Sequence, residues 1–101
     1  MLDYERHRQT LIVYLADELD HRAAARLRGE LDELLRDGNI RRLVLDLRSL
    51  RFMDSSGIGL IIGRYKLMAR RGGSVAVMNA DRRMDRIFEM AGLYELVERM
   101  A

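Results

Sequence analysis

The sequence predicts a single α/β domain over residues 1–101, in which a small mixed β-sheet carries packed helices. Its length suffices for one hydrophobic core, and 49% apolar with 34% charged residues is a globular balance. Short β-branched runs alternate with longer stretches of helical periodicity, which predicts strand–helix–strand units and hence parallel strands. A strand pair at the N-terminus predicts an antiparallel hairpin, and this makes the sheet mixed.

The hairpin is predicted from two segments joined by residues 7–10. Residues 2–6 alternate weakly between apolar and polar, and residues 11–15 are rich in β-branched and aromatic side chains. Residues 16–19 are expected to form a connector without regular structure.

A first helix is predicted after Asp20, a residue type that favours helix N-caps. Its apolar face consists of Ala24, Leu27, Leu31, Leu34 and Leu35. Gly38 and Asn39 are expected to close this helix as a C-cap pair.

The middle of the chain predicts a buried strand followed by a second helix. Residues 43–47 are apolar with little alternation, which suits a central strand covered on both faces. The expected inner face of the helix comprises Ile58, Ile61, Ile62, Tyr65, Met68 and Ala69. Gly59 and Gly63 are expected to give a flat surface that packs on the sheet, and Gly72 with Gly73 to end the helix.

The last third predicts one more strand and one more helix. Residues 74–79 form the strand, and Asp81 caps a helix that Gly92 stops. The apolar positions of this helix are Met84, Ile87, Phe88 and Ala91. Residues 93–97 are expected to form a short last strand or a turn.

The turn between the central strand and the second helix reads Asp54-Ser55-Ser56-Gly57. Its first three residues all favour helix N-caps, because their side-chain oxygens accept from unpaired first-turn amides. Gly57 allows another group to come close to the backbone. Helix N-termini also favour negative charge, so a hydroxyl held there is well placed to carry a phosphate.

Composition excludes several classes of function. The absence of cysteine excludes disulfides and Cys-based metal sites, and no motif for a cofactor is present. The N-terminal segment lacks the apolar run of a signal peptide and no run reaches the ~18 apolar residues of a membrane span, so we expect a cytoplasmic location. The net charge is +2 with arginines and acids interspersed, which argues against direct nucleic-acid binding.

Enzymatic interpretations fail on particular residues. A serine hydrolase turn would need glycines where Asp54 and Ile58 stand. A phosphoaspartate receiver could use Asp46, late in the central strand, but the chain starts with a hairpin and Lys66, its one lysine, falls in a helix. His7 and His21 are expected to be solvated without a catalytic role. We therefore expect a protein that is not an enzyme.

Five stretches, at residues 17–21, 40–47, 52–57, 63–66 and 88–93, follow one another in a familiar order. Together they resemble the STAS-domain anti-sigma factor antagonists, most closely the members that act in sporulation. The resemblance runs from about residue 8 to residue 97. The resemblance leads us to expect that the further C-terminal helix usual in that family is short or missing here.

The resemblance implies a phosphorylation-controlled partner switch in transcription regulation. In that family the unphosphorylated antagonist binds an anti-sigma factor, which is also an ATP-dependent serine kinase, and so frees the sigma factor. The kinase phosphorylates one serine of the turn, and a serine phosphatase reverses this. By position the phosphoacceptor is Ser56, with Asp20, Asp54, Ser55 and Gly57 as the surroundings that the partners would recognise.

Two alternatives stay open within this resemblance: a STAS scaffold, or a nucleotide-sensing module, of a stress-signalling complex. A P-loop lysine is absent, which leaves nucleotide binding with little support. Arg64 and Lys66 fall two to three helical turns after Ser56, so they are expected to be surface charges rather than a phosphate clamp.

Overall fold

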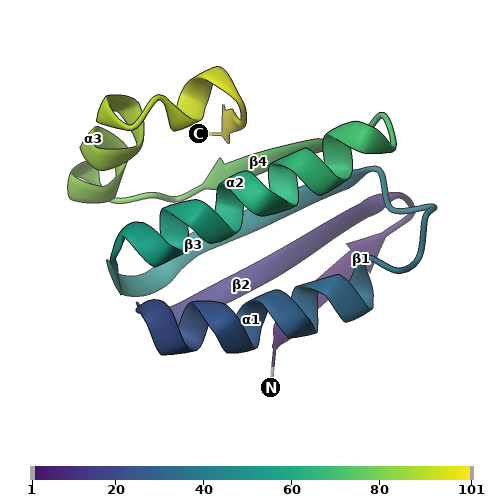
Figure 1. Ribbon diagram of the computed structural model, residues 1–101, viewed down its shortest axis with the longest axis horizontal. Helices are drawn as coiled ribbons and strands as arrows, with labels where there is room; N and C mark the ends of the chain where they lie inside the picture. Colours follow the sequence, from purple (N-terminus) through teal and green to yellow (C-terminus); the bar gives the residue numbers. More distant parts are fainter. Residues whose placement is uncertain (1, 101) are drawn as a thin grey trace.

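The computed structural model describes residues 2–100, which form one sheet with helices packed on it (Figure 1). The strands are β1 Asp3–His7, β2 Thr10–Leu19, β3 Arg42–Met53, β4 Ser74–Met78 and β5 Glu98–Met100, and the helices are α1 His21–Leu34, α2 Ser55–Arg70, α3 Arg82–Met90 and the 3₁₀ turn η1 Leu93–Glu95. The strand order is β1-β2-β3-β4-β5, antiparallel between β1 and β2 and parallel elsewhere. The predicted α/β class and the mixed sheet are confirmed.

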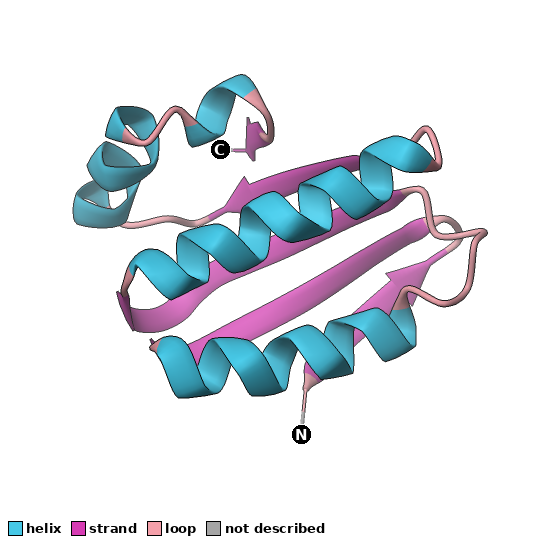
Figure 2. Ribbon diagram, in the orientation of Figure 1, coloured by secondary structure: helices cyan, strands magenta, loops and turns pink. Residues whose placement is uncertain are grey.

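Strand β3 lies at the centre of the sheet. All five residues from Leu43 to Leu47 are buried, as expected of a strand covered on both faces. Figure 2 shows α1 and α2 side by side across the front of the sheet, where their apolar sides complete the core. None of the helices within residues 2–100 is long and apolar enough to cross a membrane.

The N-terminal hairpin is confirmed, but the predicted connector at residues 16–19 is wrong. These residues continue β2 to Leu19 and pair with β3 alone. The pairing of β2 with β1 reaches only to Tyr14, which lies opposite Asp3, the first residue of β1. Two register shifts interrupt this stretch, and Asp17 adopts a positive φ of 65° there. This half of β2 has only β3 as a neighbour, and residues 16–18 are exposed. Its polar side chains therefore lack the apolar pattern from which strands are predicted.

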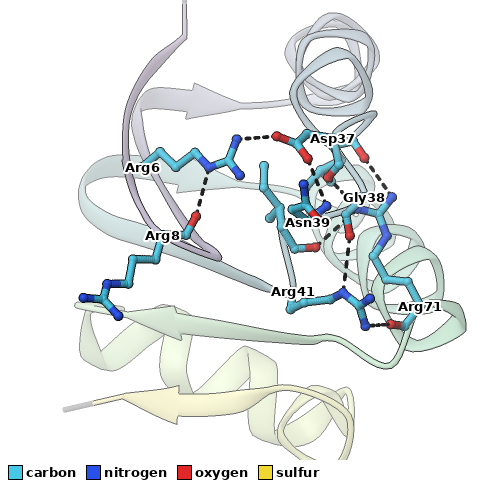
Figure 3. Close-up of polar contacts among 9 residues, drawn as sticks. Arg6, Arg8, Asp37, Gly38, Asn39, Arg41 and Arg71 are labelled. Atoms are coloured by element: carbon cyan, nitrogen blue, oxygen red, sulfur yellow. Dashed lines mark hydrogen bonds and ion pairs between the residues drawn. The ribbon is translucent and has the colours of Figure 1, made fainter.

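Helix α1 begins where predicted but ends earlier. Asp20 is the N-cap, and the C-cap is Leu35 rather than Gly38 and Asn39. The guanidinium of Arg71 donates to the carbonyl oxygens of Leu35, Asp37 and Ile40, at 2.7, 3.2 and 3.3 Å (Figure 3). A distant side chain therefore satisfies the C-cap carbonyl of Leu35 and two carbonyls of the following loop, and neither Gly38 nor Asn39 adopts the left-handed conformation of a glycine C-cap.

Helix α2 begins at the predicted turn, but its predicted inner face is only partly right. Ile61 and Met68 are buried, Leu60 is buried although it was not expected to be, and Ala69 is exposed. Apolar residues occupy most of the circumference of this helix, so their spacing does not define one face. Gly72, with φ of 74°, follows the end of the helix as predicted.

In the C-terminal part the turn, one of the two alternatives predicted for residues 93–97, is confirmed at residues 93–95, and the strand β5 was not predicted. Helix α3 is capped by Asp81 and buries Met84 and Phe88, whereas Ile87 and Ala91 are exposed. Residues 93–95 form the turn η1, and the last strand is β5, parallel to β4. The sequence Glu-Arg-Met of β5 lacks the apolar run by which buried strands are predicted.

Candidate functional site

Two helices begin next to each other at one edge of the sheet (Figure 1). Leu19 pairs with Met53 at the ends of β2 and β3, so the residues that follow them, Asp20 and Asp54, are neighbours. The Asp20 Oδ1 accepts from the backbone N–H of Ala23 at 2.9 Å, and that of Asp54 accepts from Ser56 at 2.8 Å. Each carboxylate thus caps one helix, and the positive ends of both macrodipoles meet at this edge.

The two serines of the turn have different surroundings. Ser55 is the first residue of α2 and is exposed, whereas Ser56 is half-buried. The Oγ of Ser56 lies 3.3 Å from Nδ1 of His21, the first residue of α1. Of the two hydroxyls, that of Ser56 faces the other helix.

Gly57 is buried behind the serines, against the side chains of Met53 and Leu19. A Cβ at this position would overlap Met53 Cγ and lie 2.9 Å from its Sδ and 3.1 Å from Leu19 Cδ2. The close approach expected at Gly57 is therefore made by side chains of the strands, which lock the turn against the sheet.

A groove of about 250 Å³ runs between α1 and α2 and has Ser56 in its wall. It is lined by His21, Ala24, Ala25 and Arg28 of α1 and by Ser56, Gly59, Leu60, Gly63 and Arg64 of α2. A Cβ on Gly59 or Gly63 would meet nothing within 4 Å. The expectation that these glycines pack on the sheet is wrong, because they leave this groove open toward solvent.

Arg64 ties the two walls of the groove together through an ion pair with Asp32 of α1. Its side chain is only 12% exposed, so the expectation of a surface charge is wrong for Arg64, while Lys66 is exposed as expected. Arg28 and His21 add further basic groups to the wall of the groove.

The groups with shifted pKa values lie on other parts of the molecule. A hydrogen bond from Tyr14 lowers the pKa of Glu5, and the same contact raises the pKa of Tyr14. Burial, followed by a hydrogen bond to Asp85, raises the pKa of Tyr94. Within residues 2–100 no group of three or more His, Cys, Asp or Glu side chains could hold a metal ion.

The structure brings the residues singled out in the sequence to one edge. Asp54, Ser55, Ser56 and Gly57 form a single turn, and Asp20 caps the adjacent helix. Sequence reasoning missed the contact of His21 with Ser56. The signal was available, because residues that follow neighbouring parallel strands meet at the same edge of a sheet.

Comparison with known proteins places this geometry in context. A family model described as STAS domain matches residues 1–101. The anti-sigma F factor antagonist of Paenibacillus polymyxa is 41% identical over 96 residues, which are 95% of this chain and 82% of the relative. The anti-sigma-B factor antagonist of Bacillus subtilis is 30% identical over 97 residues, which are 96% of this chain and 87% of that protein.

The fold matches solved structures of the anti-sigma factor antagonist SpoIIAA in two forms. Its unphosphorylated form is 26% identical with a TM-score of 0.80, and the match covers 100% of this chain and 88% of that one. Its phosphorylated form, from Bacillus, is 27% identical with a TM-score of 0.78, and covers 100% and 92% of the two chains.

Proposed function

Because this chain belongs to the STAS domain family and is similar throughout to anti-sigma factor antagonists, we propose that it is an anti-sigma factor antagonist controlled by phosphorylation of Ser56. In its unphosphorylated form it binds an anti-sigma factor and so releases the sigma factor. That anti-sigma factor is also the serine kinase, which holds ATP or ADP, and a serine phosphatase reverses the modification. In this proposal the chain is the substrate of a kinase and a phosphatase. It acts in the cytoplasm and needs no cofactor.

One observation carries the choice of Ser56: its hydroxyl lies in the wall of the groove, at the N-terminus of α2 and against His21 of α1. The hydroxyl of Ser55 is exposed one residue earlier and does not line the groove. The existence of SpoIIAA in a phosphorylated form, with the same fold, supports phosphorylation as the means of control.

Electrostatics explains how one phosphate could reverse the choice of partner. Phosphorylation adds about −1.5 to −2 charges and three acceptor oxygens. The N-terminus of α2, with roughly +0.5 charge, tolerates this group, so the fold survives. The kinase presents nucleotide phosphates at the same place, and burying like charges there costs about 2–5 kcal/mol of binding, at least about thirty-fold in affinity.

The partner is expected to belong to the anti-sigma F class. Identity with the anti-sigma F antagonist is 41%, against 30% with the anti-sigma-B antagonist, over similar lengths. This difference favours a role in sporulation over one in a general stress response.

The proposal is tested by incubating the chain with its anti-sigma factor kinase and ATP. We expect one added phosphate, which tandem mass spectrometry locates on Ser56. Ser56→Ala should abolish the modification and keep kinase binding, and Ser56→Asp should bind weakly. Ser55→Ala, one residue away, is the matched control and should be phosphorylated normally.

Modification of Ser55 instead would refute the assignment of the site. Equal affinity of Ser56→Ala and Ser56→Asp for the kinase would refute the electrostatic account. A pull-down with ADP that recovers a large multi-subunit assembly, and no small kinase, would support the scaffold alternative instead.

A further inference from the structure

His21 is in direct contact with the proposed phosphoacceptor. Its Nδ1 is 3.3 Å from Ser56 Oγ, and this contact joins the first residue of α1 to the second residue of α2. We propose that His21 is a positioning residue for Ser56, which orients the hydroxyl before phosphoryl transfer and donates to the phosphate after it. This inference rests on the proposed phosphorylation of Ser56.

The contact selects one orientation of a side chain that is otherwise free to rotate. A serine hydroxyl has three staggered rotamers, and the hydrogen bond to His21 favours one of them. A neutral imidazole with Nδ1 unprotonated accepts the hydroxyl hydrogen and leaves the oxygen lone pairs available for attack. The backbone of Ser56 is held as well, because Asp54 Oδ1 accepts its N–H at 2.8 Å. The acceptor oxygen is therefore held in place before the partner arrives, which favours reaction.

Phosphoryl transfer to Ser56 needs no bond to be made or broken at His21. Ser56 Oγ forms a bond to the γ-phosphorus of ATP on the kinase, and the bond from that phosphorus to the bridging oxygen breaks, so that ADP leaves. The hydroxyl proton is released to the solvent. Serine and ATP become phosphoserine, ADP and a proton, and His21 only sets the orientation.

After transfer the same nitrogen faces the phosphate. Once Nδ1 has taken up a proton from the solvent, the imidazolium donates a charge-assisted hydrogen bond to a phosphate oxygen. The other basic groups that line the groove are paired or more distant along the helices. Asp20 and Asp54 cap their helices, and Arg64 is paired with Asp32.

Arg28 lines the groove seven residues beyond His21, about two turns of α1 away. Within residues 2–100, His21 takes part in no ion pair. Among the basic side chains that line the groove, it is therefore the one in direct contact with Ser56.

The first experiment measures phosphorylation kinetics of His21→Ala and His21→Asn with the kinase and ATP. For His21→Ala we expect kcat to fall about three- to tenfold, the value of one orienting hydrogen bond, with KM changed less than about twofold. His21→Asn should recover most of the loss, because its amide places a polar atom near the position of Nδ1. His7→Ala is the matched control, because His7 is the other histidine and lies on β1, and it should react like the unchanged chain.

An unchanged kcat in His21→Ala would overturn the proposal. So would a raised KM with kcat unchanged, since that pattern indicates a contact with the kinase rather than orientation of Ser56. His21 is exposed, so its substitutions leave the core intact, and circular dichroism checks this.

The second experiment does not depend on any kinase. Phosphoserine is incorporated at position 56 during translation, and the phosphate is titrated by ³¹P NMR. An adjacent imidazolium favours the dianion, so the midpoint should lie about half a pH unit lower in the unchanged chain than in His21→Ala. His21→Asn should match His21→Ala because it carries no charge, and His7→Ala should match the unchanged chain.

Equal midpoints with and without His21 would overturn the inference while leaving the proposed function intact. Failure of the kinase to modify Ser56 would overturn the proposed function, and the titration would still decide the role of His21. The two proposals therefore fail by different results.

Discussion

The side chain of Met53 leaves no room for a Cβ atom at Gly57. We predict that Gly57→Ala lowers the free energy of unfolding by about 1–3 kcal/mol, because the added methyl overlaps Met53 and approaches Leu19. This loss exceeds the gain of up to about 1 kcal/mol that alanine brings to a helix. Urea unfolding followed by circular dichroism measures the difference.

Gly59→Ala is the matched control two residues further along the same helix. A Cβ there meets nothing within 4 Å, so the substitution should leave stability unchanged or raise it by up to about 1 kcal/mol. Equal destabilisation by both substitutions would contradict the steric explanation and point to a general cost of losing glycine in α2.

At the same scale, the candidate site was partly readable from the sequence. Cap preferences alone pointed to Asp20 and Asp54, and both carboxylates accept first-turn amides in the structure. The partner of Ser56 was missed because the signal is not local: His21 lies 35 residues earlier and follows from the pairing of β2 with β3. The paired ends of two strands decide this contact, and the local sequence does not.

At the scale of elements, the end of α1 depends on a residue that follows α2. The guanidinium of Arg71 donates to three carbonyl oxygens at and after the C-terminus of α1, and Arg41 in turn donates to the carbonyl oxygen of Arg71 at 2.6 Å (Figure 3). A cation at this position also complements the negative end of the helix macrodipole.

We predict that Arg71→Ala lowers the free energy of unfolding by about 1–3 kcal/mol, because partly buried carbonyl groups lose their donor. Arg70→Ala is the control, because Arg70 is the adjacent exposed arginine and should change stability by less than about 0.5 kcal/mol. Thermal and urea unfolding give both values. A loss of equal size in the two variants would contradict the capping role of Arg71.

The ends of elements that depend on local residues were predicted better than those that depend on distant contacts. The N-termini of α1, α2 and α3 are capped by Asp20, Asp54 and Asp81, residues of the local sequence. Asp20 and Asp81 were predicted, and Asp54 was one of three candidates in its turn. The predicted C-terminus of α1 was wrong, since Arg71, 30 or more residues away, donates to the C-cap carbonyl of Leu35 and to Ile40 in the following loop. The second half of β2 was missed for a similar reason, because β3 pairs with it from a distance.

At the scale of the whole molecule, the pH dependence of stability includes a contact between the edge strand and a loop. Arg6 of β1 forms an ion pair with Asp37, in the loop after α1. This contact, with the N–H of Asn39, holds the pKa of Asp37 below its ordinary value of 3.8. A carboxylate with a lowered pKa stabilises the fold at higher pH, and its contribution disappears as the pH falls through the folded-state value.

We predict that Arg6→Gln is less stable than the unchanged chain at pH 7 and that the difference shrinks as the pH falls below 3.8. Both side chains are more than a third exposed, so added salt should reduce the difference as well. Arg8→Gln is the control, because Arg8 contributes its backbone carbonyl to this cluster. A difference independent of pH would assign the effect to packing of the arginine stem rather than to charge.

The two ends of α2 lie at opposite edges of the sheet, with Ser56 after the end of β3 and Arg71 before the start of β4. The sixteen residues of α2 give it a length of about 24 Å. Substitutions that far apart have additive effects on the free energy of unfolding. Changes around the groove therefore leave the stabilising contacts of Arg71 unaffected. A gene duplicate of this chain could therefore acquire a new partner by mutation at one edge alone, and engineered, mutually insulated copies could be built in the same way.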